Sequence, residues 1–385
     1  MRNDPIFYKA LRNVLWLPVK RLPVVKRWNL KRLVKKGTII PLCDMDNYLN
    51  AADKVMIPPL TNKIHVGLVK EQQEIRSEDH LMKRAYWPKY ERFLKNNSIN
   101  YAFYDIQSST WQDEAARFDV VLWRPHSSPD VQAEAESKIY FLEKYLGKRC
   151  YPSFEEIWSY EDKVRASYLY KYFELPAVRT FTTNSKIEAR HFADKTSFPI
   201  VSKITTGSSS YGTVKLKNKL SALMFINSCF SRSGRKTFWP FIRQKNYVYF
   251  QKFINNANYD LRIIVVGNKV FGYYRYPKPG DFRASGSGII EKKALPEEAM
   301  TIAIDAKRKL KSTTLAVDMI YSELEKKHLI IETSIFIGID TAAQLAIDGQ
   351  PGYYEYSGNI FTFKNGKFWI QELALQEFFN FLQMP

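Results

Sequence analysis

The sequence predicts an α/β protein in which an N-terminal domain with a parallel sheet precedes a larger module built on antiparallel sheets. Strand-like and helix-like segments alternate between residues 37 and 155, which is typical of a parallel sheet. Beyond residue 155, β-rich runs are joined by short turns, which indicates antiparallel hairpins. The chain has 385 residues, of which 45% are hydrophobic, so it is long enough for two or three folded domains.

The composition indicates an anionic partner and a reducing compartment. The formal net charge of +19 favours binding to a nucleotide, a nucleic acid, an acidic glycan or a membrane surface. Three cysteines lie too far apart for a disulfide framework or a metal cluster, so we expect a cytoplasmic protein. The sequence contains neither a secretory pattern at its start nor an apolar run of about eighteen residues that could span a bilayer.

Residues 1–36 form a basic segment with eleven Lys or Arg residues against one Asp. Apolar residues recur at helical spacing between Ile6 and Leu15, and Pro18 and Pro23 interrupt any single helix. Such a segment can lie on an anionic membrane surface, which would make the protein peripheral at the inner membrane face. The alternative is an arm that packs on its own domain and exposes a solvated charged face.

The N-terminal domain is expected over residues 37–155. Its strands are predicted at Ile64–Val69, Asn100–Ile106 and Phe118–Pro125, and a helix is predicted over Trp87–Ile99. We find no G-x-G-x-x-G fingerprint after these strands, so the domain is not an obvious dinucleotide site.

From residue 151 onward the pattern changes. A helix is predicted from a Ser or Asp cap through Lys163, and the strand FPIVSK ends at Lys203. A Gly/Ser/Thr loop follows, and its small residues would let backbone N–H groups approach phosphate oxygens. Gly207 and Gly212 have P-loop spacing, but the Lys-Ser/Thr pair that a P-loop requires is missing. A plain hairpin turn is the alternative reading of this loop. The chain closes with a helix, QELALQEFFNFL.

A Gly-Asn turn at positions 267–268 predicts a two-residue β-hairpin. The turn pairs Arg262 with Tyr273 and Asp260 with Arg275, which places these four side chains on one face. The opposite face is apolar. The hairpin therefore combines a charged working face with a core face.

Arg283 follows the hairpin in the Gly/Ser-rich loop GDFRASGSG. Together with Arg262 and Arg275 it provides three guanidinium groups, which suit bidentate binding of carboxylate or phosphate. The alternative is a solvated face on which Asp and Arg pair across the strands.

Two carboxylates, Asp318 and Glu332, interrupt the β-forming runs LAVDMIY and HLIIET. The polar turn SELEKK between the runs predicts a hairpin that places both acids on one face. Like charges at such positions destabilise a sheet, so a divalent cation between them, most simply Mg²⁺, would explain the pair. Two solvated acids on an exposed face are the alternative.

This order of motifs resembles the ATP-grasp superfamily, in particular its glutathione-synthetase-like carboxylate–amine ligase branch. The resemblance extends over residues 155–340 and rests on the ordered set rather than on one motif. It implies a two-lobed ATP-grasp module with antiparallel sheets over 156–385, with a lid lobe over about 190–255. Residues 37–155 would then be the N-terminal α/β (pre-ATP-grasp) domain.

The resemblance also implies cofactors, ATP and Mg²⁺, and the residues that bind them. The expected nucleotide-binding residues are Lys163, Lys203, Ser208, Ser209, Ser210, Gly212, Gln251, Lys252, Phe253, Ile254 and Asp260. The expected metal ligands are Asp318, Glu332 and Ser334. Arg262, Arg275 and Arg283 would bind the acceptor carboxylate and the acyl-phosphate. Two positions depart from the family pattern, which often has Glu in place of Lys252 and Asn in place of Ser334.

The function expected from this resemblance is an ATP-dependent ligase that joins a carboxylate to an amine through an acyl-phosphate. The acceptor would be an amino acid, a peptide or a glycan uronic acid, and a homodimer is left open. One alternative is an ATP-grasp-type kinase that phosphorylates a hydroxyl. The other is a basic nucleic-acid-binding protein, a partner class that we do not expect because charge is spread over the whole chain. Its candidate residues would be Arg232, Arg235, Lys236, Trp239 and Arg243.

Overall fold

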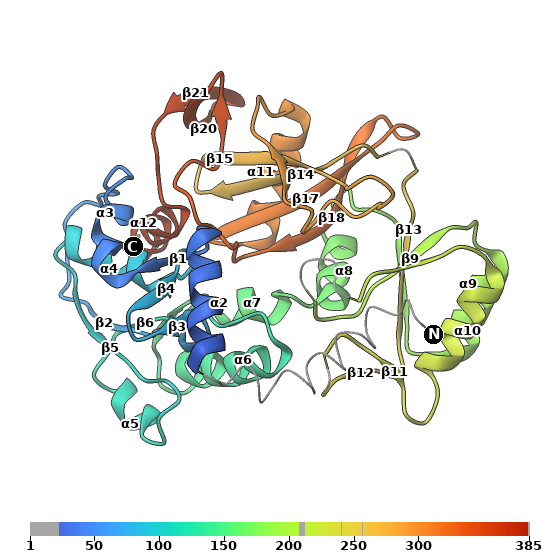
Figure 1. The fold of residues 1–385 in the computed structure, drawn as a ribbon, viewed down its shortest axis with the longest axis horizontal. Coiled ribbons are helices and arrows are strands. Elements are labelled where there is room, and N and C mark those ends of the chain that lie inside the picture. The colour runs from blue at the N-terminus through green and yellow to red at the C-terminus, as the bar shows by residue number, and fades with distance from the viewer. Residues whose placement is uncertain (1–22, 208–211, 240, 256, 384–385) are drawn as a thin grey trace.

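The structure is a computed structural model, and Figure 1 shows three regions. The N-terminal α/β region, blue to cyan, lies beside a large antiparallel sheet in orange and red, and a green and yellow lobe extends to the opposite side. The predictions for Ser208, Ser209 and Ser210, and for the segment before residue 23, lie outside the described residues. The structure describes residues 23–207, 212–239, 241–255 and 257–383.

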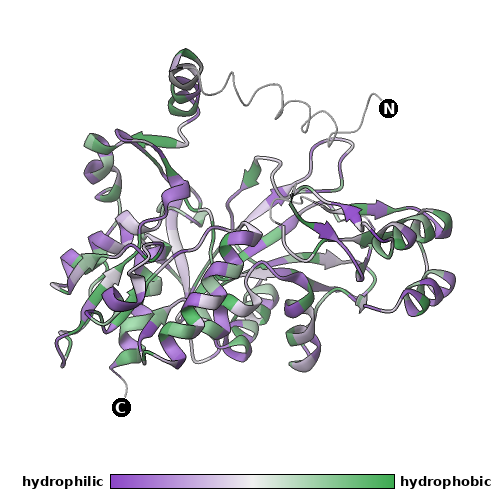
Figure 2. Ribbon diagram, turned by 90° about the horizontal axis from the view of Figure 1, so that it is seen from below, coloured by the Kyte–Doolittle hydropathy of each residue, from purple (hydrophilic) through white to green (hydrophobic). Residues whose placement is uncertain are grey.

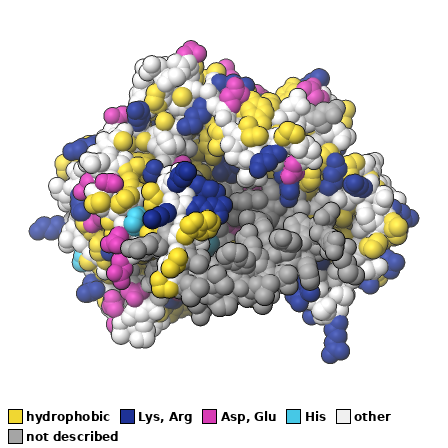
Figure 3. Space-filling view, viewed as in Figure 1, with side chains coloured by type: hydrophobic (Ala, Val, Ile, Leu, Met, Phe, Trp, Pro, Cys, Tyr) yellow, Lys and Arg dark blue, Asp and Glu magenta, His cyan; other side chains and the backbone are white. Residues whose placement is uncertain are grey.

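Helix α2, Pro23–Lys35, carries the described part of the basic segment and begins at one of the two prolines expected to interrupt it. Figure 2 shows this helix, next to the grey N-terminal trace, projecting from the rest of the molecule. The Trp28 side chain is exposed, and Figure 3 shows Lys and Arg side chains gathered over this part of the surface. Among the described residues, no helix has both the length and the apolarity needed to cross a membrane.

The N-terminal region is built on a parallel sheet, as predicted. Its strands read β5-β2-β6-β7 across the sheet, and most of their apolar side chains are buried beneath flanking helices. The strands are β2 (His65–Leu68), β5 (Asn100–Phe103), β6 (Val120–Leu122) and β7 (Arg149–Tyr151). The helices of this region are α3 (Met45–Leu49), α4 (Trp87–Asn96), α5 (Trp111–Ala115) and α6 (Pro129–Lys144). A small antiparallel sheet adds β1 (Ile39–Pro41), β3 (Ile75–Ser77) and β4 (His80–Met82).

The main sheet is antiparallel and has eight strands in the described part of the chain. Its path is β18-β17-β14-β15-β20-β19, with β16 paired to β15 and β21 paired to β20. The strands are β14 (Asp260–Val266), β15 (Lys269–Tyr276), β16 (Ile289–Glu291), β17 (Thr314–Ser322), β18 (Lys327–Ser334), β19 (Ala346–Ile347), β20 (Gln350–Ser357) and β21 (Ile360–Asn365). Helix α11 (Glu297–Leu310) packs on this sheet.

Both hairpins predicted in this sheet are confirmed. The two-residue turn pairs Asp260 with Arg275 and Arg262 with Tyr273. Asp318 lies opposite Glu332, next to an irregularity in the β17–β18 ladder. Strand β14 also pairs with β17, which brings Arg262 directly opposite Asp318, a contact that the sequence pattern did not predict.

The lid lobe, residues 180–252, contains a four-stranded antiparallel sheet in the order β10-β9-β13-β8. It begins about ten residues before the boundary expected from the sequence, because β8 belongs to it. Its sheet and helices enclose a separate hydrophobic core. The strands are β8 (Thr180–Thr183), β9 (Ile200–Ser202), β10 (Val214–Leu216), β11 (Arg235–Lys236), β12 (Arg243–Gln244) and β13 (Val248–Lys252), and the helices are α9 (Lys186–Lys195) and α10 (Lys219–Cys229). Helices α7 (Phe154–Ser159) and α8 (Lys163–Tyr172) lead into the lobe.

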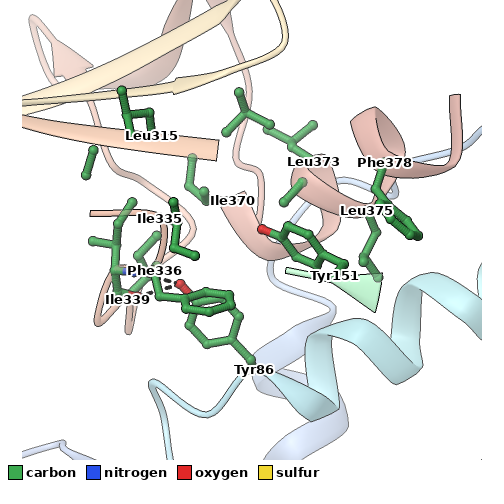
Figure 4. Packing of buried hydrophobic residues seen from close by; sticks show 14 of the residues in the cluster. Tyr86, Tyr151, Leu315, Ile335, Phe336, Ile339, Ile370, Leu373, Leu375 and Phe378 are labelled. Atoms are coloured by element: carbon green, nitrogen blue, oxygen red, sulfur yellow. Dashed lines mark hydrogen bonds between the residues drawn. The ribbon is translucent and has the colours of Figure 1, made fainter. Parts of the chain in front are cut away.

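The last helix, α12 (Ile370–Leu382), joins the main sheet to the N-terminal region. Glu372 forms a buried ion pair with Arg92 of α4 at 2.6 Å, and Phe379 stacks on Phe93 with ring centroids 5.9 Å apart. Figure 4 shows side chains from α12, from β17 and from the N-terminal region in one hydrophobic cluster. Helix α12 thus contacts the N-terminal region. The domain boundary at residue 155 remains a prediction.

Candidate active site

Two adjoining cavities lie between the main sheet and its neighbours. The lid cavity, about 270 Å³, is bounded by the lid lobe and the main sheet. The central cavity, about 430 Å³, is bounded by the main sheet and the N-terminal region. The residues that line both cavities are Lys163, Arg275, Ala284, Ser285, Ile331 and Glu332. The two cavities therefore meet at a boundary that carries both basic and acidic groups.

Asp318 is buried at this boundary and is held by two arginines. Arg262 donates two hydrogen bonds of 2.7 Å to its carboxylate, and Arg275 lies 2.9 Å from Oδ2. Burial alone would raise the pKa of Asp318, but these two guanidinium groups lower it well below its usual range. The repulsion between Asp318 and Glu332 is thus relieved by basic side chains, an explanation that the sequence analysis did not consider.

Glu332 has lysine neighbours instead. Lys163 Nζ lies 3.5 Å from Glu332 Oε2 and donates a hydrogen bond of 2.5 Å to the carbonyl of Gly207. Although burial would raise the pKa of Glu332, Lys163 and Lys203 lower it. Lys163 is fixed at the start of α8, where the Asp162 carboxylate caps the helix by accepting hydrogen bonds from two backbone N–H groups.

Lys203 follows β9 and lines the lid cavity. Its side chain is buried, and burial lowers its pKa to about 8. It is therefore cationic at neutral pH. Lys163 and Lys203 together offer two cations to an anionic group in the lid cavity.

The lid cavity also has an apolar end. Gln251, Lys252, Phe253 and Ile254, which the family resemblance assigns to the nucleotide, line the same cavity. Apolar side chains from the lid lobe, the main sheet and their connections complete this part: Val178, Val201, Ile320 and Ile331. A planar, largely apolar group can therefore bind next to the two lysines.

The three arginines of the sequence prediction do not converge on one point. Arg275 pairs with Asp318 and also with Asp260 on the neighbouring strand. Burial raises the pKa of Asp260 to about 6, although Arg275 opposes this shift. Arg283 instead pairs with Asp281 at 2.8 Å in the loop after β15, and it lines only the lid cavity. Asp260 also lines the lid cavity, so its predicted place beside the nucleotide remains open to test.

Gly212 is the described end of the Gly/Ser loop, and its backbone requires glycine. Its φ is +78°, and a Cβ atom would lie 2.7 Å from the side chain of Ile204. The basic segment after this loop is part of the lid lobe: Arg235 donates to Gln244, and Trp239 donates to the carbonyl of Thr206. These contacts give Arg235 and Trp239, two of the five residues considered for nucleic-acid binding, a structural role.

Three charged residues of the central cavity were not predicted from the sequence. Arg84 and Arg124 enter it from the N-terminal region, and Glu161 enters it just before Lys163. Arg124 could have been identified, because it lies at the carboxyl end of a predicted parallel strand, where ligands bind in such sheets. Glu161 has a left-handed backbone, with φ at +57°, which is common at functional sites. No sequence signal marks Arg84.

The two predicted metal-binding carboxylates are of the type that Mg²⁺ prefers, but both oxygens of Asp318 are paired with arginines. Asp318 and Glu332 face each other across the sheet, and carboxylate oxygens are the ligands that this ion prefers. Ser334 donates its hydroxyl proton to the carbonyl of Phe336 at 2.7 Å, so the lone pairs of its oxygen remain available. Within the described ranges, no group of three or more His, Cys, Asp or Glu side chains could hold a metal. The two carboxylates would therefore need further oxygen ligands from phosphate or water.

Comparison with known proteins identifies the fold. Residues 161–348 match the model of the RimK-like ATP-grasp domain. The alpha-aminoadipate–LysW ligase LysX of Saccharolobus solfataricus is 26% identical over 179 residues, which make up 45% of this chain and 61% of that protein. The chain thus spans about three fifths of the length of this curated relative.

The chain also resembles solved structures. D-cycloserine synthetase DcsG superposes with a TM-score of 0.52 at 12% identity, over 82% of this chain and 99% of that chain. D-alanine–D-alanine ligase from Bacillus anthracis gives a TM-score of 0.49 at 17% identity, over 71% and 88% of the two chains. The domain match and the first superposition confirm the α/β fold with antiparallel sheets that the sequence predicted.

Proposed function

We propose that this chain, which contains a RimK-like ATP-grasp domain, is an ATP-dependent ligase that joins a carboxylate to an amine. The reaction would pass through an acyl-phosphate and release ADP and phosphate. The observation that carries the proposal is the meeting of the lid cavity and the central cavity at Lys163, Arg275 and Glu332. A nucleotide in the first cavity and an acid in the second would meet at that boundary.

The lid cavity has the groups that a nucleotide requires. ATP-grasp ligases use ATP with Mg²⁺, the two cofactors that the sequence predicts. Lys163 and Lys203 would bind phosphate oxygens, and residues 251–254 would contact the adenine. We keep Ser208, Ser209, Ser210 and Gly212 as proposed phosphate contacts on the basis of the sequence alone.

Asp318 and Glu332 would hold Mg²⁺, with Ser334 as a weaker neutral ligand. When bound, the ion would neutralise phosphate charge during transfer. Asp318 is occupied by Arg262 and Arg275, so metal binding would exchange at least one of these contacts. The released guanidinium would then be free to bind the acid or the transferred phosphoryl group.

Other residues of the central cavity would position the reacting carboxylate and limit its contact with water. Arg262 and Arg275 line the central cavity and would hold the carboxylate in line with the phosphate, an arrangement that overcomes charge repulsion. The loop residues Ser285–Gly288 cover part of the same cavity and would limit the access of water, which hydrolyses acyl-phosphates. The amine that completes the reaction would enter through the central cavity.

We also propose the chemical class of the acceptor and the location of the protein. An amino acid, a peptide or a glycan uronic acid all provide the required carboxylate, and the alpha-aminoadipate in the name of the LysX relative supports an amino acid among these. The basic segment 1–36 would bind an anionic membrane surface through helix α2 and the residues before it. Equal sedimentation of the full chain and of residues 37–385 with anionic vesicles would exclude this membrane role. A homodimer remains a proposal without a mapped interface.

The test of the reaction is ADP release over a panel of carboxylates, each with and without amines. ADP release that depends on both a carboxylate and an amine supports ligation. Turnover with a polyol alone would instead show a kinase. Hydroxylamine provides a second readout, because it traps an acyl-phosphate as a hydroxamate even when the natural amine is unknown.

A further inference from the structure

The wall of the central cavity that belongs to the N-terminal region carries two arginines, Arg84 and Arg124. Arg124 follows β6, which lies next to β2 in the parallel sheet. The chain order of the strands reverses between β2 and β6, since β5 lies on the other side of β2. In open α/β sheets, ligands bind in the crevice outside the carboxyl ends of strands at such a point.

These two arginines share one carboxylate. Glu74 Oε2 lies 2.9 Å from Arg84 Nε, and Glu74 Oε1 lies 3.2 Å from Arg124 Nη1. The nearby Glu71 accepts hydrogen bonds from the backbone N–H groups of Tyr86 and Trp87, and burial raises its pKa to about 7. The two guanidinium groups thus share Glu74 as their ion-paired carboxylate.

The opposite wall of the cavity is closer to electrical balance. Arg262 and Arg275 there are matched by two carboxylates, Asp318 and Asp260. On the side of Arg84 and Arg124, by contrast, two arginines share a single ion-paired carboxylate, Glu74.

Arg124 also has an unused donor. Its side chain is nine-tenths buried, and its Nε atom has no hydrogen-bond partner among the described residues. Arg84 uses Nε for Glu74, and 41% of its side chain is exposed. An unpaired donor on a buried guanidinium costs free energy. Because Nε has less than 1 Å² of exposed surface, a bound carboxylate or phosphate would reach it only after a shift of the Arg124 side chain.

We propose that the acid substrate carries a second anionic group, which Arg84 and Arg124 bind across the central cavity from the reacting carboxylate. The substrate class is thus an acid with at least two anionic groups, in which the second is a carboxylate or a phosphate. This inference rests on the proposed ligase function. Arg84 and Arg124 determine specificity and do not contact the reacting atoms.

The experiment measures binding to the full-length protein by ligand-observed NMR, so it does not depend on turnover. The probes are the dicarboxylates succinate, glutarate and adipate, the monocarboxylate butyrate, and 3-phosphonopropionate. We expect at least one dianion to bind about tenfold more tightly than butyrate, which corresponds to one strong charge-assisted contact. A preference for the phosphonate over the dicarboxylates would identify phosphate as the second group.

Arg124→Met and Arg84→Gln should each reduce this preference to about unity while butyrate binding stays unchanged. Arg84→Gln alters a partly exposed side chain, so it tests the inference even if Arg124→Met does not fold. Arg117→Gln is the matched control, because Arg117 belongs to the same region and pairs with Glu114 on the surface. It should keep the preference of the natural protein.

The inference is overturned if no dianion binds more tightly than butyrate, or if the preference survives in both variants. The proposed ligase function fails separately, if no acid in the ADP-release panel supports turnover. Selective dianion binding without turnover would therefore keep the second anion site and reject the ligase.

Discussion

Asp318 is the residue that forms ion pairs with two arginines of the site, Arg262 and Arg275. It is buried at 3% exposure and neutralises Arg262 and Arg275 at the same time. If this carboxylate were removed, Arg262 would lose its ion-pair partner and Arg275 would keep only Asp260. Asp318 therefore stabilises the β14–β17 pairing, and we propose that it also provides an oxygen ligand for Mg²⁺.

Asp318→Asn should lower the free energy of unfolding by about 3 kcal/mol, because it breaks a buried charge network from one side. It should also abolish the ADP release that requires Mg²⁺. Urea unfolding and metal titration measure the two effects. A variant with unchanged stability and a normal Mg²⁺ response would contradict both roles of Asp318.

Lys203 gives the site a pH dependence. Burial holds its pKa near 8, and a bound phosphate would raise it, because the cation gains a partner. ADP binding should therefore be strongest below pH 8 and weaken as the pH rises toward 9. Calorimetric titration at several pH values measures this, with Lys203→Arg as the control.

Arginine remains charged over this range, so Lys203→Arg should bind ADP with a flatter pH profile. If the natural protein and this variant show the same profile between pH 7 and 9, Lys203 does not contact the phosphates.

At the scale of elements, strands β14 and β15 position the arginines of the boundary. They approach closely at Gly272, where a Cβ atom would lie 2.6 Å from the backbone oxygen of Arg262. A backbone atom in a central strand pair cannot move away as a flexible side chain can. This glycine is therefore required by packing rather than by its backbone angles.

Gly272→Ala should destabilise the protein by about 1–3 kcal/mol, as expected for overpacking, and should reduce ADP release by displacing Arg262. Thermal and urea unfolding measure the first effect. Gly338→Ala is the control, because its Cβ would have its nearest contact at 3.8 Å and fit without strain. Equal stability of the two variants would show that the hairpin tolerates the added methyl group.

Local elements could be predicted from the sequence, whereas long-range contacts could not. The Gly-Asn turn fixes the β14–β15 register, so the pairing of Asp260 with Arg275 followed from chain geometry. The contact of Arg262 with Asp318 depends on pairing between strands about fifty residues apart, which no turn specifies. Arg84 was missed for the same reason, because only the docking of the N-terminal region places it in the central cavity.

At the scale of the whole molecule, two hydrophobic cores divide the described part of the chain. One core includes the N-terminal region, the main sheet and α12, and the other lies within the lid lobe. The central cavity is thus bounded by elements that share a core, while the lid cavity is bounded by elements that do not.

Arg92→Met tests the connection made by α12. The change would leave Glu372 buried without its cation, which should cost about 3–5 kcal/mol in the free energy of unfolding. Burial already raises the pKa of Glu372 to about 7, so the folded protein holds this proton more tightly than the unfolded chain does. The contribution of Glu372 to stability therefore falls as the pH rises from about 4.5 to 7.

The loss in Arg92→Met should accordingly be larger at pH 8 than at pH 5 in urea unfolding. Arg117→Met removes an exposed pair and should cost less than about 1 kcal/mol. A loss in Arg92→Met as small as that of this control would show that α12 does not hold the two regions together.

The most direct test of the account is a crystal structure with a nonhydrolysable ATP analogue and Mg²⁺. The account predicts a triphosphate between Lys163 and Lys203, an adenine against residues 251–254, and the metal ion on Asp318 and Glu332. A nucleotide bound elsewhere, with Asp318 still held by both arginines and without a metal ligand, would contradict it.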